Sequence, residues 1–215
     1  MNRVELIKIA DLSFSYDTMP ILNNVHLQMN AGDISCIIGD NGTGKTTLLK
    51  LLTGIIHPKN KFKILVDTTT LNVEEFKKKL VFIPSEPQFY DKLSLLDNIQ
   101  IIQYLWKQDN TYIDNVFQFL DELNFDTSNT QLIETYSLGM RYKVALACFF
   151  SIDTPLVILD EPLNSLDHDS QNIMINLIKK EAETGRIFLF SSHSTEIQNQ
   201  LASKIYYLKN QQLHS

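Results

Sequence analysis

The stretch Gly39-Asp-Asn-Gly-Thr-Gly-Lys-Thr46 fits the pattern G-x-x-x-x-G-K-[ST] of a phosphate-binding loop. An apolar run at 34–38 precedes it, and a helix-favouring, leucine-rich run at 46–52 follows it. The order of strand, glycine-rich loop and helix is the context in which this pattern binds nucleotide phosphates. The alternative is a plain glycine-rich turn between a strand and a helix. The flanking runs favour a nucleotide site.

The residue types of this loop suit a triphosphate. Glycines let the main chain approach a phosphate closely, and successive backbone N–H groups of 42–46 can surround it. The positive end of the following helix points at the same anion. Lys45 adds a full charge near the β- and γ-phosphates, and the Thr46 hydroxyl is a ligand for Mg²⁺. The predicted nucleotide contacts in this stretch are Gly39, Asn41, Gly42, Thr43, Gly44, Lys45, Thr46 and Thr47.

Composition narrows the class of protein. The chain has 215 residues, of which 44% are apolar, and this is enough for one domain with a substantial core. Its net charge of −6 argues against a nucleic-acid partner. No apolar run reaches the roughly 18 residues that span a bilayer, and the charged start is not a signal peptide, so we expect a cytoplasmic protein. Cys36 and Cys148 lie in apolar stretches, which favours two buried free thiols.

The pattern of apolar residues predicts an α/β fold. Alternation over 4–16 and 25–29 indicates two half-buried strands before the phosphate loop. In both outer thirds of the chain, strands alternate with helices, which implies a parallel sheet. The middle third is helical and has the form of an inserted lobe. Helices are expected at 45–53, 73–79, 94–106, 112–123, 137–150, 169–183 and 194–202, and further strands at 64–66, 80–83, 156–159, 186–191 and 204–208.

A second candidate group follows the apolar strand 156–159. The strand ends in Asp160-Glu161, and a carboxylate at the tip of a neighbouring strand can hold Mg²⁺ through water, the role expected of Asp160. A second carboxylate beside it suits a base for the attacking water. The alternative is an acidic strand end without a special role. The presence of the phosphate loop favours the catalytic interpretation.

These stretches together resemble the nucleotide-binding domain of ABC ATPases along nearly the whole chain. The markers occur in the family's order. They are the phosphate loop, then Tyr136-Ser-Leu-Gly-Met-Arg141, then Leu156-Val-Ile-Leu-Asp-Glu-Pro-Leu-Asn-Ser-Leu-Asp167, then Ser191-Ser-His193. The resemblance implies a P-loop NTPase (RecA-like) parallel-sheet core, with an N-terminal antiparallel β-subdomain and an inserted helical subdomain. It implies a single domain over 1–215, with 1–84 and 152–215 forming the core and 85–151 the helical subdomain.

The resemblance also assigns roles to single residues. Tyr16 matches the aromatic that stacks on adenine, although a strand aromatic facing the core is the alternative. Glu161 matches the catalytic base. His193 matches the switch histidine, which contacts the γ-phosphate and orients the water.

Further matches concern the second half of the nucleotide site. Ser137 and Gly139 match the signature motif, which in the family contacts ATP held by the other subunit. The usual Ser-Gly-Gly reads Ser137-Leu138-Gly139 here, a form that also occurs in some bacterial exporter cassettes. Residues 165–167 match the loop that couples the two sites across the dimer.

One stretch departs from the family pattern. After the strand 80–83 the family has Pro-Gln-Glu-Pro, whereas this chain has Pro84-Ser85-Glu86-Pro87. The missing glutamine normally reaches Mg²⁺ and the attacking water, and the shorter Ser85 would need a bridging water. Gln88 could replace it if the loop shifted, but the two prolines stiffen the loop. We expect slower hydrolysis or altered coupling.

The sequence therefore predicts an ATP-binding and ATP-hydrolysing subunit of a membrane ABC transporter, with ATP and Mg²⁺ as ligands. It would dimerise head to tail around two ATP, as a homodimer or a paralogue heterodimer. Its partners would be transmembrane permease subunits, and it would lie peripherally on the inner face of the cell membrane. The alternatives are a soluble ABC ATPase, a regulatory cassette that binds ATP without turnover, and a small-molecule P-loop kinase, which would not explain the signature motif. The transported substrate is not encoded here, and the signature leans toward export.

Overall fold

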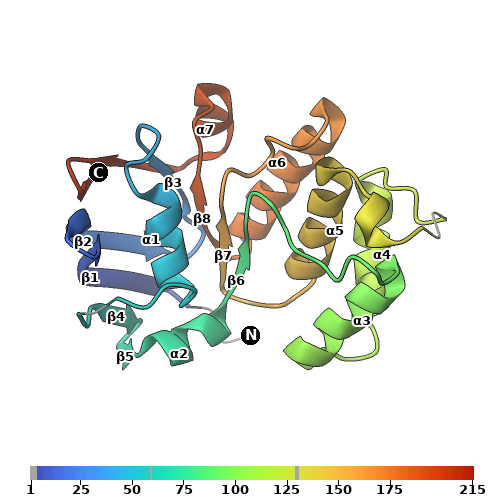
Figure 1. Cartoon of the computed structure of the whole chain (residues 1–215), viewed down its shortest axis with the longest axis horizontal. Helices are drawn as coiled ribbons and strands as arrows, with labels where there is room; N and C mark the ends of the chain where they lie inside the picture. The colour runs from blue at the N-terminus through green and yellow to red at the C-terminus, as the bar shows by residue number, and fades with distance from the viewer. Residues whose placement is uncertain (1–3, 59, 129–130) are drawn as a thin grey trace. The chain divides into compact units, whose positions relative to one another are not determined.

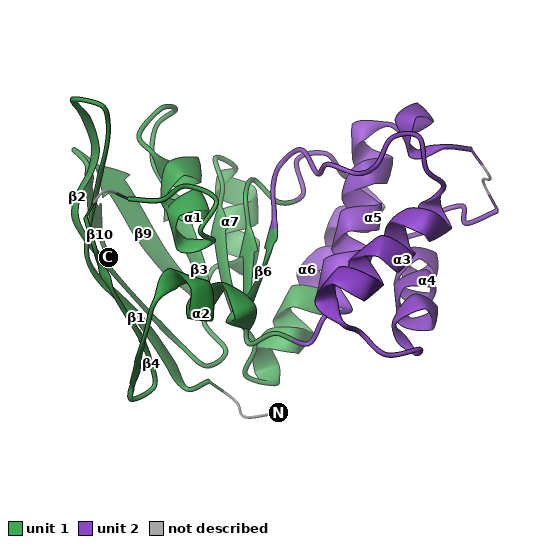
Figure 2. Cartoon of the chain, turned by 60° about the horizontal axis from the view of Figure 1, so that its bottom comes forward, with its two compact units in different colours: residues 1–82, 154–162, 177–215 green, residues 83–153, 163–176 purple. Residues whose placement is uncertain are grey.

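The computed structural model describes residues 4–58, 60–128 and 131–215 of the chain (Figure 1). By its internal contacts, the chain forms two compact units (Figure 2). Unit 1 comprises residues 1–82, 154–162 and 177–215, and unit 2 comprises 83–153 and 163–176. The segment 163–176 therefore groups with the helices of the middle of the chain. The division into subdomains at 84/85 and 151/152 remains a prediction.

Unit 1 contains an antiparallel sheet of four strands in the order β2-β1-β4-β5. Along its two long strands, buried apolar side chains alternate with more exposed, mostly polar ones, as expected for a sheet with one solvated face. The register pairs Ile7 with Met29 and with Val66 on the two neighbours of β1. The strands are β1 (Leu6–Tyr16), β2 (Met19–Asn30), β4 (Lys63–Val66) and β5 (Thr69–Leu71).

The second sheet of unit 1 has six strands in the order β10-β9-β3-β8-β7-β6. Strand β3 runs parallel to β8 and β9, and β7 runs parallel to β8. Both β7 and β8 are buried along their full length, which explains their continuous apolar sequences. The strands are β3 (Ile34–Ile38), β6 (Leu80–Ile83), β7 (Leu156–Leu159), β8 (Ile187–Ser191), β9 (Lys204–Lys209) and β10 (Gln212–His214).

One hydrophobic cluster joins the two sheets and helix α1 (Lys45–Leu52). Helix α1 contributes four fully buried leucines, Leu48, Leu49, Leu51 and Leu52. The core of unit 1 therefore fixes the helix that follows the phosphate loop. Cys36 and Cys148 are buried free thiols, as predicted, and burial raises the pKa of each to about 12. The other helices of unit 1 are α2 (Val73–Phe76), which is followed by a 3₁₀ turn at Lys77–Lys79, and α7 (Thr195–Leu201).

Unit 2 is built from helices α3 (Leu95–Trp106), α4 (Tyr112–Glu122) and α5 (Leu138–Phe150), with a 3₁₀ turn at Ile133–Thr135. Helix α6 (His168–Glu183) begins in unit 2 and ends in unit 1. Ser94 forms the predicted capping box with Asp97 at the start of α3. Tyr112 is buried, and its hydroxyl donates to the carbonyl of Cys148 over 2.9 Å, which links α4 to α5.

The secondary structure agrees with the sequence prediction to within a few residues at most boundaries. Two elements were missed. The hairpin strand β10 follows β9 after a turn at Asn210 and Gln211, both with positive φ, and β5 pairs with β4. Each is short, so its alternation is too brief to be recognised. No helix within 4–58, 60–128 or 131–215 is long and apolar enough to cross a membrane.

Candidate nucleotide-binding and hydrolysis site

The phosphate loop lies between the end of β3 and the start of α1, as predicted. Two of its glycines have no room for a side chain. A Cβ on Gly39 would lie 2.6 Å from the Leu208 carbonyl oxygen of β9, and one on Gly44 would lie 2.6 Å from Ile21 Cγ2. Gly44 also has φ of +106°, a conformation that strains other residues. These two glycines thus let the loop pack against its neighbouring strands.

The backbone N–H groups in the first turn of α1 have no side-chain cap, so they are available to an anion. Gly44 occupies the N-cap position, so no side chain accepts a hydrogen bond from the first turn. The first turn also lacks an acidic residue. The free N–H groups and the helix dipole together favour a bound phosphate here.

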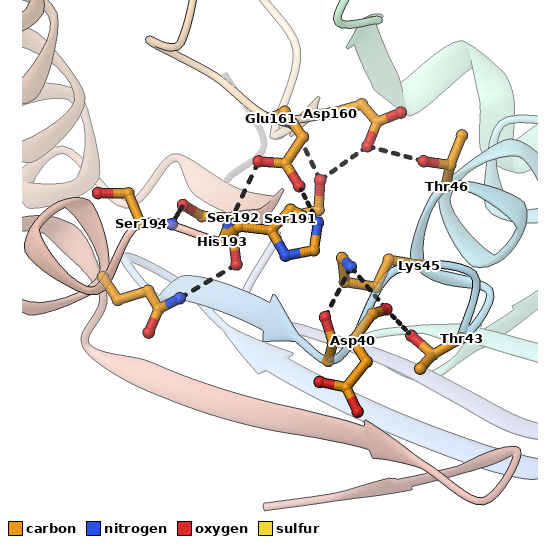
Figure 3. A network of polar contacts seen from close by, with 12 residues as sticks. Asp40, Thr43, Lys45, Thr46, Asp160, Glu161, Ser191, Ser192, His193 and Ser194 are labelled. Carbon is orange, nitrogen blue, oxygen red and sulfur yellow. Dashed lines mark hydrogen bonds and ion pairs between the residues drawn. The ribbon is translucent and has the colours of Figure 1, made fainter.

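Lys45 is buried and folds back over the loop. Its Nζ donates to the carbonyl oxygens of Gly39 at 2.8 Å and Asp40 at 3.2 Å (Figure 3). Burial holds the pKa of Lys45 below its usual range, and the nearby carboxylates of Glu161 and Asp160 oppose that shift. A buried ammonium that donates to carbonyl oxygens can form a stronger hydrogen bond with a charged partner such as a phosphate.

Asp160 is buried at the end of β7 and faces Thr46 of α1. The Thr46 hydroxyl lies 3.2 Å from Asp160 Oδ1, and the Ser191 hydroxyl lies 2.7 Å from the same oxygen (Figure 3). Hydroxyl and carboxylate oxygens are the ligands that Mg²⁺ prefers. The described residues hold no cluster of three or more His, Cys, Asp or Glu that could bind a metal. A pair of oxygens fits Mg²⁺, which usually takes few protein ligands and completes its shell with phosphates and water.

Glu161 and His193 contact each other directly. His193 Nε2 lies 3.0 Å from Glu161 Oε1, and the His193 N–H donates to Glu161 Oε2 over 3.3 Å (Figure 3). Glu161 has a positive φ of 50°, which costs a residue with a Cβ of order 1–3 kcal/mol and is typical of functional positions. The structure therefore brings the two residues predicted as base and switch into one site.

The residues on either side of His193 form hydrogen bonds that fix this segment. The Ser194 N–H donates to Ser192 Oγ over 3.1 Å, and Gln198 of α7 donates to the Ser192 carbonyl over 3.1 Å. A cavity of about 400 Å³ opens beside His193 and the start of the phosphate loop. It is lined by Ile38, Gly39, Asp40, Ser192, His193, Gln198, Tyr207, Leu208 and Lys209.

Tyr16 lies at the end of β1 in unit 1. It is 48% exposed, and its ring packs edge-on against the buried ring of Phe14, with centroids 4.8 Å apart. About half of the residue's surface is therefore accessible to a ligand. Its role at the adenine remains a prediction.

Ser137 and Gly139 lie in unit 2, at the start of α5. Ser137 caps the helix by accepting a hydrogen bond from the Met140 N–H over 3.2 Å. A Cβ on Gly139 would lie 2.6 Å from the Ser165 carbonyl oxygen, so only glycine fits. The signature segment thus packs directly on the loop after Glu161, within the same compact unit.

An ion pair joins the same two segments. Lys143 of α5 lies 2.9 Å from Asp167 Oδ2, and it also donates to the Leu123 carbonyl over 2.9 Å. The Ser170 N–H and hydroxyl both donate to Asp167. These hydrogen bonds and Lys143 hold the pKa of Asp167 well below its usual range. Sequence reasoning did not single out Lys143, because its partner lies far along the chain.

The strand–loop–helix phosphate site, with carboxylates at the end of the neighbouring strand, defines a P-loop nucleotidase of the α/β class. Residues 22–164 match the ABC transporter family, so the chain belongs to that family. It is an ATP-binding subunit of an ABC transporter and an ABC-type ATPase.

Individual relatives resemble most of the chain. The lantibiotic transport ATP-binding protein SrtF of Streptococcus pyogenes is 28% identical over 87% of this chain and 80% of its own length. The SkfA peptide export ATP-binding protein SkfE of Bacillus subtilis is also 28% identical, over 98% of this chain and 88% of its own.

Solved structures confirm the fold class. An ATP-binding subunit of an ABC transporter superimposes with a TM-score of 0.88 at 24% identity, over 98% of this chain and 88% of its own. A dimeric ATP-binding cassette bound to ADP and Pi superimposes with a TM-score of 0.84 at 20% identity, covering 97% of each chain. The antiparallel subdomain and the mostly parallel sheet with helices were both predicted correctly.

Proposed function

We propose that ATP binds on residues 39–47 and is hydrolysed by water that Glu161 activates. The observation that carries this proposal is one hydrogen-bonded network from Thr46 through Asp160 and Ser191 to Glu161 and His193. Glu161 is the base, His193 orients the water and contacts the γ-phosphate, and Lys45 offsets charge that develops on the phosphates.

Mg²⁺ would be held by the hydroxyl of Thr46 and, through water, by Asp160. When bound there, it would neutralise negative charge on the phosphates. Both residues are anchored, Thr46 on α1 and Asp160 at the end of β7. The close approach of their oxygens, 3.2 Å, supports this assignment.

We propose a head-to-tail dimer in which each ATP is completed by Ser137 and Gly139 of the other subunit. The helix start at Ser137 and the 45% exposed Leu138 suit an intermolecular contact with an anion. Similarity to the dimeric cassette supports the arrangement. One copy carries one of each motif, so a second copy or a paralogue must supply the other half.

We propose that unit 2 receives the transporter's membrane subunits, which would place the protein peripherally on the inner face of the cell membrane. The support is an apolar patch on and before α3, in which Tyr90, Leu96, Tyr104 and Leu105 are between 42% and 83% exposed. A cavity of about 450 Å³ on this part of unit 2 is lined by Tyr90, Leu93, Asp97, Gln100, Ile101, Tyr104 and Leu105. Exposed apolar clusters of this kind mark interaction sites.

Charges placed on this patch are expected to release the subunit from membranes. The double variant Tyr104→Glu, Leu105→Glu would lower copurification of a detergent-solubilised permease by about tenfold or more, because interface anchors carry most of the binding energy. ATPase activity of the isolated protein would be unchanged. Ile55→Glu, at a 57% exposed apolar residue of unit 1, is the matched control. Equal copurification of both variants would contradict the assignment of the patch.

Ser85 is expected to limit turnover. Ser85→Gln would restore the longer amide and raise the ATPase rate by about fivefold, roughly the effect of one net hydrogen bond. The Mg²⁺ dependence would shift as well. The nearby Gln88 donates its amide to the Glu86 carbonyl over 3.2 Å. Gln88→Ala is therefore the control, and an unchanged rate in Ser85→Gln would show that the serine is inconsequential.

The substrate and direction of transport belong to the permease, which forms the pathway. Relatives of comparable identity include peptide export proteins and sugar and polyamine import proteins. Copurification with a permease is the experiment that separates a transporter subunit from a soluble ABC ATPase.

A further inference from the structure

Ser191 is a fully buried polar residue at the end of β8. Strand β8 pairs in parallel with β7, and the register places Phe190 opposite Leu159. Ser191 directly follows Phe190, and Asp160 directly follows Leu159. The register therefore puts the serine hydroxyl beside the carboxylate at the same edge of the sheet, where Figure 3 shows both side chains.

The hydroxyl of Ser191 joins two groups of the site at once. It donates its single proton to Asp160 Oδ1 over 2.7 Å, and its oxygen accepts the backbone N–H of Glu161 over 2.9 Å. Asp160 Oδ1 also accepts from Thr46. A hydroxyl is the smallest side-chain group that can donate to one partner and accept from the other at this spacing.

Glu161 needs such support because its backbone is in the left-handed region, with φ of 50°. A residue with a Cβ stays in that conformation only where its surroundings hold it there. The hydrogen bond from its N–H to Ser191 is a contact that fixes this backbone, and the backbone in turn aims the carboxylate.

We propose that Ser191 is a positioning residue for hydrolysis, which sets the orientation of the Asp160 carboxylate and the backbone of Glu161 together. This inference rests on the roles proposed above for Asp160 and Glu161. Removing the hydroxyl would free Asp160 to rotate and would let Glu161 leave its strained conformation. Both the response to Mg²⁺ and the catalytic rate would then suffer, whereas the phosphate loop would remain intact.

The test compares Ser191→Ala with Ser35→Ala. Ser35 lies on β3 of the same sheet, is also fully buried, and its hydroxyl has no hydrogen-bond partner among the described residues. The two variants remove the same atom from the same sheet, but only one removes bonds to the site. Ser191→Thr keeps a hydroxyl and is the rescue variant. Thermal melting followed by circular dichroism reports whether each variant is folded.

Two measurements are made on each folded variant. The first is the affinity for a non-hydrolysable ATP analogue in EDTA and in Mg²⁺, and the second is kcat over a range of Mg²⁺ concentrations. In Ser191→Ala we expect affinity in EDTA close to wild type, a Mg²⁺ requirement raised about 10-fold, and kcat lowered about 10–100-fold, as for other groups that orient metal ligands. Ser35→Ala should match wild type, and Ser191→Thr should recover most of the loss.

The outcomes separate this inference from the proposed roles. Wild-type Mg²⁺ dependence and kcat in a folded Ser191→Ala variant would overturn the positioning role, even where Glu161→Gln is inactive. A parallel loss in Ser35→Ala would show a packing effect and also overturn it. Full turnover in Glu161→Gln would instead overturn the role proposed for Glu161 itself.

Discussion

Glu161→Gln is expected to bind ATP with nearly wild-type affinity and to lose at least about 100-fold in turnover, the lower range of general-base catalysis. Glutamine keeps the size of the side chain and a hydrogen-bonding oxygen, but it cannot take a proton from water. The proposed ATP contacts at 39–47 lie in the loop after β3 and in the first turn of α1, on segments other than that of the substituted side chain, so we expect binding to be retained. The measurement is phosphate release, with nucleotide binding followed separately.

The same variant tests the dimer. In the proposed head-to-tail dimer, hydrolysis of ATP would let the two subunits separate. A variant that binds but does not hydrolyse ATP should therefore accumulate as a dimer in size-exclusion chromatography with ATP. Glu122→Gln, at an exposed position of α4, is the matched control and should hydrolyse ATP normally. A Glu161→Gln protein that remains monomeric with ATP would argue against the head-to-tail arrangement. Wild-type turnover in it would assign the base elsewhere.

Lys45→Met is expected to weaken ATP binding by about 10–100-fold. A hydrogen bond to a charged group contributes roughly 1.5–3 kcal/mol, and the ammonium is buried beside the phosphate loop. Methionine has nearly the same length and apolar stem, so the packing of α1 is preserved. The measurement is the dissociation constant of a fluorescent ATP analogue in Mg²⁺.

The control for Lys45→Met is Lys50→Met in the last turn of the same helix. It removes the same charge away from the loop and should bind ATP as wild type does. Lys45→Arg keeps the charge but spreads it over a larger planar group, so we expect it to restore binding only in part. Equal affinity in wild type and Lys45→Met would place the triphosphate away from this loop.

Most of the fold was predictable because its signals are local. The capping serines Ser94 and Ser137 mark helix starts within a few residues, and the fully apolar runs of β7 and β8 indicate buried parallel strands. Elements as short as β5 and β10 carry too few alternating positions to be recognised.

The chain itself specifies the chemical groups of the site. The glycines, Lys45 and Thr46 form a continuous stretch, and Asp160 and Glu161 directly follow a buried strand, so each set is assembled by local backbone geometry. The contacts between these two groups of residues depend on the tertiary structure. Ser191 lies 31 positions from Asp160, and only the parallel register of β7 and β8 brings its hydroxyl within 2.7 Å. In the sequence, Ser191 could have been noticed because it is the one polar residue at the end of the otherwise apolar strand β8.

The pairing of Lys143 with Asp167 was hidden in the same way. Asp167 belongs to a recognised motif, but nothing in the sequence links it to Lys143, and their contact depends on how α5 packs against the loop that precedes α6. Periodicity and motifs describe residues that are neighbours along the chain. Strand register and helix packing depend on side chains distant in sequence meeting in one core, so the contacts they create appear only in the folded protein.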